Sequence, residues 1–198
     1  MKLSRVLGLL ACFIFALSAH AQHLYFETLT TRNGLSSNDI TCVYEDHNGF
    51  LWVGTRDGLN KFDGRVFKSF RADPADSNSL SGNNISAIMQ DKQGIFWIAT
   101  RDGGLTRYDE NAPEKKQFRQ FRFNPKDPHT IATNQLFCLE DWNDDYVLIG
   151  AETSPGIFIN KKTFQFSYWN FPDGKLAPQY AVPKYTGKYN WIQWISET

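Results

Sequence analysis

The tetrapeptide TRDG occurs twice in this sequence, at residues 55–58 and 100–103, and its side chains are the ones best suited to bind a ligand. An arginine guanidinium can donate two parallel hydrogen bonds to a carboxylate or to the oxygens of a sugar. The candidate ligand-binding residues are therefore Arg56, Asp57, Arg101 and Asp102. The alternative is that the tetrapeptide recurs because a tight turn needs it, with a local Arg–Asp pair.

A second candidate is an acidic stretch with part of the spacing of a calcium-binding loop. The residues at loop positions 1, 3, 5 and 12 are Asp141, Asn143, Asp145 and Glu152. Position 6 requires a glycine for its sharp turn, but Tyr146 stands there, and residues 147–150 have the composition of a strand. We therefore expect an acidic hairpin turn, and we expect neither a metal nor a cofactor in this chain.

Catalytic motifs are absent from the sequence. It contains no nucleophile elbow, no metalloprotease helix motif and no phosphate-binding loop. The histidines at positions 23, 47 and 129 lack metal-ligand spacing. A glycosidase would need two carboxylates that converge on one sugar, which a repeated turn does not provide. We expect no catalytic site here.

The tetrapeptides belong to longer repeated units, in which Trp52 and Trp97 stand 45 residues apart. The units span about 33–72, 76–123 and 128–171. Each is predicted to hold four short strands: a first at 40–46, 85–91 or 136–141, a second at 51–55, 96–100 or 147–151, a third starting at 59, 105 or 157, and a fourth at 66–70, 118–123 or 164–168. No segment has a helical apolar period, so we expect almost no helix.

The second strand of each unit is apolar on both faces, so both faces must be covered. Sheets that stack on one another achieve this, and the period and strand count are those of a β-propeller. We predict an all-β propeller segment of about three four-stranded blades, with Trp52 and Trp97 between blades. Residues 190–198 resemble the first strand of a fourth blade. Because rings close with 4–8 blades, we expect an incomplete ring from a longer protein; the alternative is a ring completed by other copies.

The two cysteines outside the N-terminal segment, Cys42 and Cys138, share one repeat position with Ala87. Equivalent positions two blades apart are too distant for a disulfide. We therefore predict two small, buried, unpaired apolar side chains.

Residues 1–21 are predicted to be a signal peptide. Lys2 and Arg5 precede an apolar run at 6–17, and Ala19-His20-Ala21 forms a cleavage pattern. A lipoprotein cleavage site ending at Cys12 fits less well, because the apolar run continues beyond it. No membrane span is predicted in residues 22–198. This interpretation predicts an exported protein in which residues 22–198 form the partial propeller.

The charge balance argues against nucleic acid as a partner, because basic and acidic residues number 21 each. One basic run alternates with phenylalanines, at Lys115, Lys116, Phe118, Arg119, Phe121, Arg122, Phe123 and Lys126. A polyanion-binding strip is one interpretation. We favour an outer strand with inward aromatic and outward charged side chains.

The pattern Gly34-Leu35-x-x-Asn38, Glu45-Asp46-x-x-Gly49-x-Leu51-Trp52-x-Gly54-Thr55, Gly58-Leu59 resembles the two-component regulator propeller repeat. The second unit matches with Ala99 in place of glycine and an extra glycine at 103–104. The third unit departs most, because Leu148 replaces the tryptophan. The resemblance covers about 33–171 and 190–198.

This resemblance implies the periplasmic sensor of a hybrid two-component system, whose downstream histidine kinase is not in this chain. It further implies three partners: an oligosaccharide ligand, the remaining blades of the same full-length chain, and a second copy in a homodimer of the full-length protein. Two alternatives remain: an exported propeller enzyme acting on polysaccharide, and a non-catalytic interaction scaffold.

Overall fold

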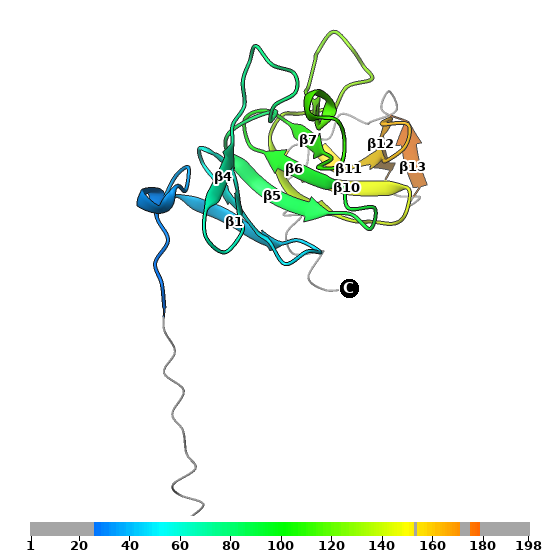
Figure 1. The fold of residues 1–198 in the computed structure, drawn as a ribbon. Helices are drawn as coiled ribbons and strands as arrows, with labels where there is room; N and C mark the ends of the chain where they lie inside the picture. Colours follow the sequence, from blue (N-terminus) through cyan, green and yellow to red (C-terminus); the bar gives the residue numbers. More distant parts are fainter. Residues whose placement is uncertain (1–25, 153, 171–174, 179–198) are drawn as a thin grey trace, which may run out of the picture.

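The computed structural model describes residues 26–152, 154–170 and 175–178. These residues form three antiparallel sheets and two short 3-10 helices, η1 (Thr31–Asn33) and η2 (Glu114–Lys116). Figure 1 shows the sheets following one another in chain order, from blue and cyan through green to orange. The predicted signal peptide and the predicted strand at 190–198 lie outside the described residues.

Each repeated unit forms one sheet whose neighbouring strands are consecutive in sequence. Blade 1 contains β1 (Ile40–Glu45), β2 (Leu51–Thr55), β3 (Gly58–Phe62) and β4 (Phe67–Phe70). Blade 2 contains β5 (Ile85–Gln90), β6 (Phe96–Thr100), β7 (Leu105–Tyr108) and β8 (Phe118–Phe121). Blade 3 contains β9 (Leu136–Glu140), β10 (Tyr146–Ala151), β11 (Ser154–Asn160), β12 (Phe166–Asn170) and a fifth strand, β13 (Lys175–Pro178). The predicted all-β blades are confirmed, whereas β13 was not predicted.

The blades stack face to face. Blade 1 contacts blade 2 through β1, β2 and β5, and blade 2 contacts blade 3 through β5, β6 and β9. Two apolar clusters fill these interfaces. Among the described sheets, blade 2 has a neighbouring sheet on each face, which explains why its second strand, β6, is apolar on both faces.

Trp52 fills the interface between blades 1 and 2, as predicted. It is fully buried, and its ring centroid lies 4.4 Å from that of Phe96 and 5.9 Å from that of Tyr108, both on blade 2. The indole Nε1 donates a hydrogen bond of 2.8 Å to the buried carboxylate of Asp46. The same carboxylate accepts the backbone N–H groups of residues 48 and 50, so it shapes the β1–β2 turn and fixes the indole together.

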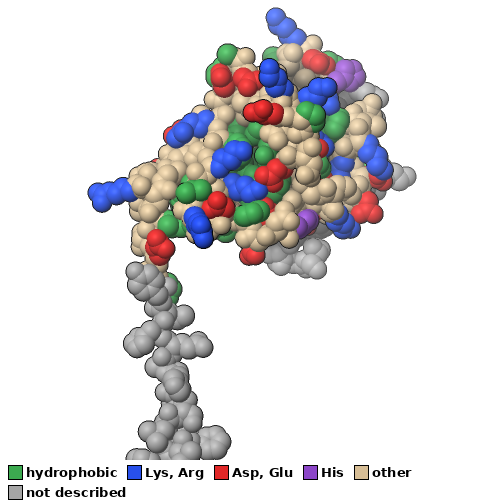
Figure 2. Space-filling view, viewed as in Figure 1, with side chains coloured by type: hydrophobic (Ala, Val, Ile, Leu, Met, Phe, Trp, Pro, Cys, Tyr) green, Lys and Arg blue, Asp and Glu red, His purple; other side chains and the backbone are tan. Residues whose placement is uncertain are grey.

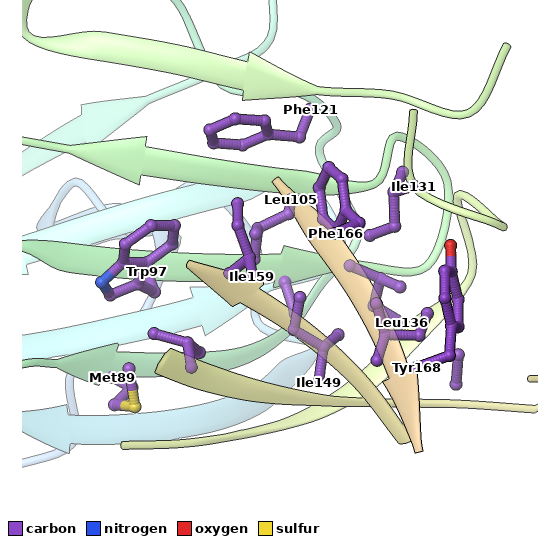
Figure 3. Packing of buried hydrophobic residues seen from close by; sticks show 14 residues of the cluster. Met89, Trp97, Leu105, Phe121, Ile131, Leu136, Ile149, Ile159, Phe166 and Tyr168 are labelled. Atoms are coloured by element: carbon purple, nitrogen blue, oxygen red, sulfur yellow. The ribbon is translucent and has the colours of Figure 1, made fainter. Parts of the chain in front are cut away.

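Trp97 repeats this arrangement between blades 2 and 3. Figure 3 shows it beside Ile159 of blade 3, within a cluster that also holds Phe121 and Phe166. Its Nε1 donates to Asp91 at 2.9 Å, and Asp91 accepts two backbone N–H groups of its own turn. The repeated tryptophan is therefore an inter-blade side chain whose orientation is set by its own hairpin.

Blade 3 lacks the Asp–Trp pair, and its sheet register corrects our alignment there. Glu140 faces Leu148 just as Tyr44 faces Trp52. Trp142 rather than Asp141 therefore occupies the position of Asp46. Asp141 forms an ion pair with the buried ammonium of Lys161 instead.

Cys42 and Cys138 are unpaired, as predicted, and their sulfurs occupy the space above two glycines. A Cβ added to Gly54 would lie 2.5 Å from the Cys42 sulfur, and a Cβ added to Gly150 would overlap that of Cys138. In blade 2 the corresponding pair is Ala87 facing Ala99. The two positions therefore accommodate either cysteine with glycine or alanine with alanine.

Replacing Gly150 with alanine is expected to lower the free energy of unfolding by about 1–3 kcal/mol, because the added methyl overpacks against the Cys138 sulfur. The double variant Cys138→Ala/Gly150→Ala copies the blade 2 pair and should recover most of that loss. Urea unfolding of both variants and of Cys138→Ala completes a double-mutant cycle. Additive effects would contradict this account of the pair.

Two buried tyrosines should make the protein sensitive to alkali. Burial raises the pKa of Tyr108 to about 12, with the charges of Glu110 and Asp109 adding to the effect. Burial also raises the pKa of Tyr168 to about 12. An unfolded tyrosine ionises near pH 10, so both tyrosines contribute their full stability below about pH 10 and lose it as the pH rises towards about 12.

The measurement is the free energy of unfolding between about pH 9 and pH 11, together with phenolate absorbance. Tyr108→Phe should flatten the decline and remove one late-titrating phenol. Ionisation of every native tyrosine near pH 10 would contradict this prediction.

Candidate ligand-binding rim

One rim of the blades is built from the β2–β3 and β6–β7 turns, each lying against the connector that leads into the next blade. Backbone N–H groups of the first turn donate from Arg56 to the Asp39 carbonyl at 3.1 Å and from Gly58 to the Asn83 carbonyl at 2.8 Å. The backbone N–H of Arg101, in the second turn, donates to the carbonyl of Asn84, the residue after Asn83, at 2.9 Å. The connector at 83–84 therefore touches both TRDG turns, and the two turns share one continuous surface.

A repeated asparagine fixes each connector. The side-chain oxygen of Asn83 accepts the backbone N–H of Ala72 at 2.8 Å, and that of Asn134 accepts the N–H of Phe123 at 2.7 Å. Asn38 does the same for Thr31 at 2.9 Å. The third unit thus keeps this feature although it has lost the tryptophan.

The threonine of the repeated tetrapeptide and the glycine that precedes the third strand have structural roles. The buried hydroxyl of Thr55 donates to the Gly58 carbonyl at 2.9 Å, and that of Thr100 donates to the Gly104 carbonyl at 3.0 Å. Gly58 and Gly104 have φ angles of 120° and 91°, in the left-handed region that favours glycine. The extra glycine of the second turn is therefore Gly103, one residue before the position equivalent to Gly58.

The two aspartates of the tetrapeptides are engaged by the protein. Asp57 pairs with Arg71 at 3.0 Å, with both side chains about half exposed. Asp102 accepts the backbone N–H groups of Asn83 and Asn84 at 3.3 Å. The local Arg–Asp pair that we considered for these turns is not formed among the described residues, because each aspartate has a different partner.

The two arginines are available to a ligand. Arg56 is exposed, and within the described part of the chain its guanidinium makes no hydrogen bond, ion pair or ring contact. Arg101 is also exposed, and its guanidinium carbon lies 4.6 Å from the ring centroid of Phe137. Stacking on an aromatic face leaves the planar N–H donors of arginine free at the edge. The rim therefore presents two exposed guanidinium groups on neighbouring turns.

Phe137 is a residue of this rim that the sequence analysis did not single out. It lies in β9, directly after the buried Leu136, and it corresponds to Thr41 and Ser86 in the other blades. The sequence signal that could have identified Phe137 is an aromatic side chain at a position where the other units carry a hydroxyl. Its contact with Arg101 could not be predicted, because Arg101 belongs to the preceding blade.

At the opposite rim, the acidic stretch is balanced by ion pairs with lysines. Three carboxylates of the acidic stretch are each paired with a lysine: Asp141 with Lys161, Asp144 with Lys92, and Asp145 with Lys162. The Asp144 pair joins blades 2 and 3, and it lowers the pKa of Asp144 and raises that of Lys92. No metal-ligating group of three or more His, Cys, Asp or Glu side chains occurs among the described residues.

The basic run lies mainly on the outer strand β8 and its flanks. Phe121 is buried and Phe118 is half-buried, whereas Phe123, beyond the end of the strand, is exposed. Arg119 stacks on the ring of Phe164 of blade 3, with 4.1 Å between guanidinium carbon and ring centroid. Figure 2 shows basic and acidic side chains interspersed over the face in view. The outer-strand interpretation fits this arrangement, apart from the outward Phe123.

The family model "Two component regulator propeller" matches residues 34–57 and 79–102, the first halves of the units that form blades 1 and 2. The chain carries two-component regulator propeller repeats. The match ends at the TRDG turns in both units, so these turns and the Asp–Trp hairpins belong to the regulator propeller repeat. Neither matched segment lies in blade 3, whose unit lacks the Asp–Trp pair.

Among curated proteins, Histidine kinase P4 of Formosa agariphila is 41% identical over 78 residues. Among solved structures, the extracellular domain of the hybrid two-component system BT3049 from B. thetaiotaomicron matches with a TM-score of 0.64 and 28% identity, over 73% of this chain. The extracellular domain of the one-component system BT4673 from the same organism shares the fold, with a TM-score of 0.55 and 22% identity over 72% of the chain.

This chain corresponds to a small part of the length of each of these proteins. The chain spans 6% of the kinase and 20% of each of the two extracellular domains. No described helix is both long and apolar enough to cross a bilayer.

Proposed function

We propose that this chain is a segment of the ligand-sensing propeller of a hybrid two-component signalling protein. The observation that carries the proposal is the tandem of regulator propeller repeats in a chain that matches an extracellular domain of a hybrid two-component system. A sensor on the outer side of a membrane must be exported, and the signal peptide predicted at residues 1–21 would supply the export signal. We place the sensor in the periplasm, with the histidine kinase downstream.

The proposed ligand is derived from a glycan, and the proposed binding residues are at the rim. Arg56 and Arg101 have donors that the described protein leaves free, and they lie on neighbouring turns. Bidentate donation from arginine suits the carboxylate or the adjacent hydroxyls of a sugar. Asp57 and Asp102 hold the turns and remain partly accessible, so they contribute chiefly by positioning the arginines.

Calorimetry of the complete extracellular domain against a panel of neutral and acidic oligosaccharides tests the proposal. Replacing Arg56 and Arg101 together with alanine should weaken binding at least about tenfold, because hydrogen bonds to charged groups contribute about 1.5–3 kcal/mol each. The control is Arg65→Ala, which removes an exposed arginine from the β3–β4 hairpin. Binding by the double variant at wild-type affinity would remove the rim site, and no binding of any glycan by the wild type would remove the glycan ligand.

A further inference from the structure

The first strand of each blade has a β-bulge close to the rim, and blade 3 carries an aromatic residue there. The register between the first two strands shifts at this place, and the extra residue is Thr41 in blade 1, Ser86 in blade 2 and Phe137 in blade 3. A bulge changes the direction of one side chain relative to the alternation of its strand. Phe137 is accordingly half-buried, although Leu136 before it is fully buried.

The ring of Phe137 holds the guanidinium of Arg101, which belongs to the preceding blade. The guanidinium carbon lies 4.6 Å from the ring centroid. Stacking on an aromatic ring restricts the orientation of a guanidinium and leaves its N–H donors at the edge. Arg56 has the equivalent place one blade earlier, but the residue that corresponds to Phe137 there is Ser86, which has no ring. Of the two rim arginines, only Arg101 is therefore preorganised.

Positive charge is left unbalanced at the same end of blade 2. On blade 1, Asp57 neutralises Arg71 at 3.0 Å. The sheet registers place Arg122 at the corresponding position of blade 2, where its Nε donates to a glutamine amide at 3.1 Å. Asp102, the carboxylate of this turn, accepts N–H groups of the connector instead. Within the part of the chain that the structure describes, neither Arg101 nor Arg122 forms an ion pair, which favours an anionic group of a ligand here.

A neutral sugar suits this part of the rim less well. Its hydroxyl groups need acceptors as well as donors. The carboxylates of the two turns, Asp57 and Asp102, already accept hydrogen bonds from the protein. The connectors carry a carboxylate only in blade 1, at Asp39, because Asn84 and Gln135 stand at the equivalent positions of blades 2 and 3. The free charged groups at the boundary between blades 2 and 3 are therefore donors.

We infer that this boundary selects an acidic oligosaccharide, and that Phe137 sets the selectivity by orienting Arg101. The recognised chemistry is a charged group with two adjacent oxygen acceptors, which a uronic acid supplies as carboxylate and a sulfated sugar as sulfate. Arg101 donates two parallel hydrogen bonds to these oxygens. Phe137 is a positioning residue, because it acts through the guanidinium. The inference rests on the proposed function, since it specifies the class of glycan that the same rim binds.

Calorimetry of the complete extracellular domain with matched trisaccharides tests the inference. The probes are a trimer of galacturonic acid, a trimer of galactose 6-sulfate and the neutral trimer of galactose. We expect one of the acidic trimers to bind at least about tenfold more tightly than the neutral trimer, because hydrogen bonds to charged groups are the stronger ones. The tighter of the two acidic trimers identifies the acid group as carboxylate or sulfate.

Variants of the pair show whether the preference depends on the stacked arginine. Phe137→Ser copies the residue of blade 2 and should reduce the preference at least about threefold, whereas Phe137→Tyr keeps a ring and should retain it. Arg101→Lys, at an exposed position, keeps the charge without the planar donors and should also reduce the preference. The control is Phe123→Ser, which removes an exposed ring next to the connector and should leave the preference unchanged.

Three results would overturn the inference. They are equal affinity of the wild type for acidic and neutral trimers, no measurable binding of either acidic trimer, and an unchanged preference in both Phe137→Ser and Arg101→Lys. Each of them leaves the proposed function in place as long as the domain binds another glycan of the panel. If no glycan binds, the glycan ligand of the proposed function is removed as well.

Discussion

Replacing Trp97 with alanine is expected to lower the free energy of unfolding by about 3–5 kcal/mol, the range for truncating a large buried aromatic side chain. Trp97 is fully buried between blades 2 and 3, among side chains of both blades. Its loss would open a cavity in the interface and leave the Asp91 carboxylate without its indole donor. Urea unfolding followed by circular dichroism gives the change directly.

Trp97→Phe separates packing from hydrogen bonding. Phenylalanine keeps an aromatic ring in the interface but has no N–H donor for Asp91, so it should cost clearly less than alanine. A loss below about 1 kcal/mol for Trp97→Ala would contradict the inter-blade role, because that size of effect is typical of surface positions.

Replacing Asp91 with alanine is expected to cost about 3 kcal/mol or more. Its carboxylate is buried and accepts three hydrogen bonds, from the backbone N–H groups of Gln93 and Ile95 at 3.0 Å and from Trp97 Nε1 at 2.9 Å. Hydrogen bonds to a charged acceptor contribute about 1.5–3 kcal/mol each, and donors left unpaired in the interior add a penalty. The free energy of unfolding again measures the effect.

Asp91→Asn is the matched variant. It keeps the size of the side chain and one oxygen that can accept the two backbone N–H groups, but its amide presents a donor to the indole N–H. We expect an intermediate loss, and we expect that loss to shrink when Trp97 is already phenylalanine. An unchanged loss in the Trp97→Phe background would show that Asp91 acts on the turn alone.

The fold was largely predictable from the sequence because the same pattern of apolar strands and turn residues recurs in three consecutive units. The twelve strands expected in three units are present, with ends that differ by at most three residues. Apolar second strands between turn residues need cover on both faces, which stacked sheets provide, and the recurring Trp52 and Trp97 indicate where the stacking occurs. The third unit was harder, because without the Asp–Trp pair its first hairpin could be aligned one residue out of register.

The candidate site was predictable only in part. The repeated arginines indicated which turns to consider, but the partners of Asp57 and Asp102 come from other segments, as does the ring beneath Arg101. Sequence spacing within one turn carries no information about a connector or a strand of the next blade. The local Arg–Asp pair, which was the alternative for these turns, is not formed for this reason, and Phe137 was missed for the same reason.

The sequence by itself determined the local structure of this protein: the strands, the glycine turns, the unpaired cysteines and the repeated blade. The strands and turns follow from alternation and turn chemistry, which act over a few neighbouring residues, and the blades and unpaired cysteines follow from the repeat of about 45 residues. Only the tertiary structure decided which rim arginines are free and which carboxylates are neutralised by lysine. It also decided which apolar side chains of the first strands are buried, because coverage and charge pairing depend on what lies across an interface between blades.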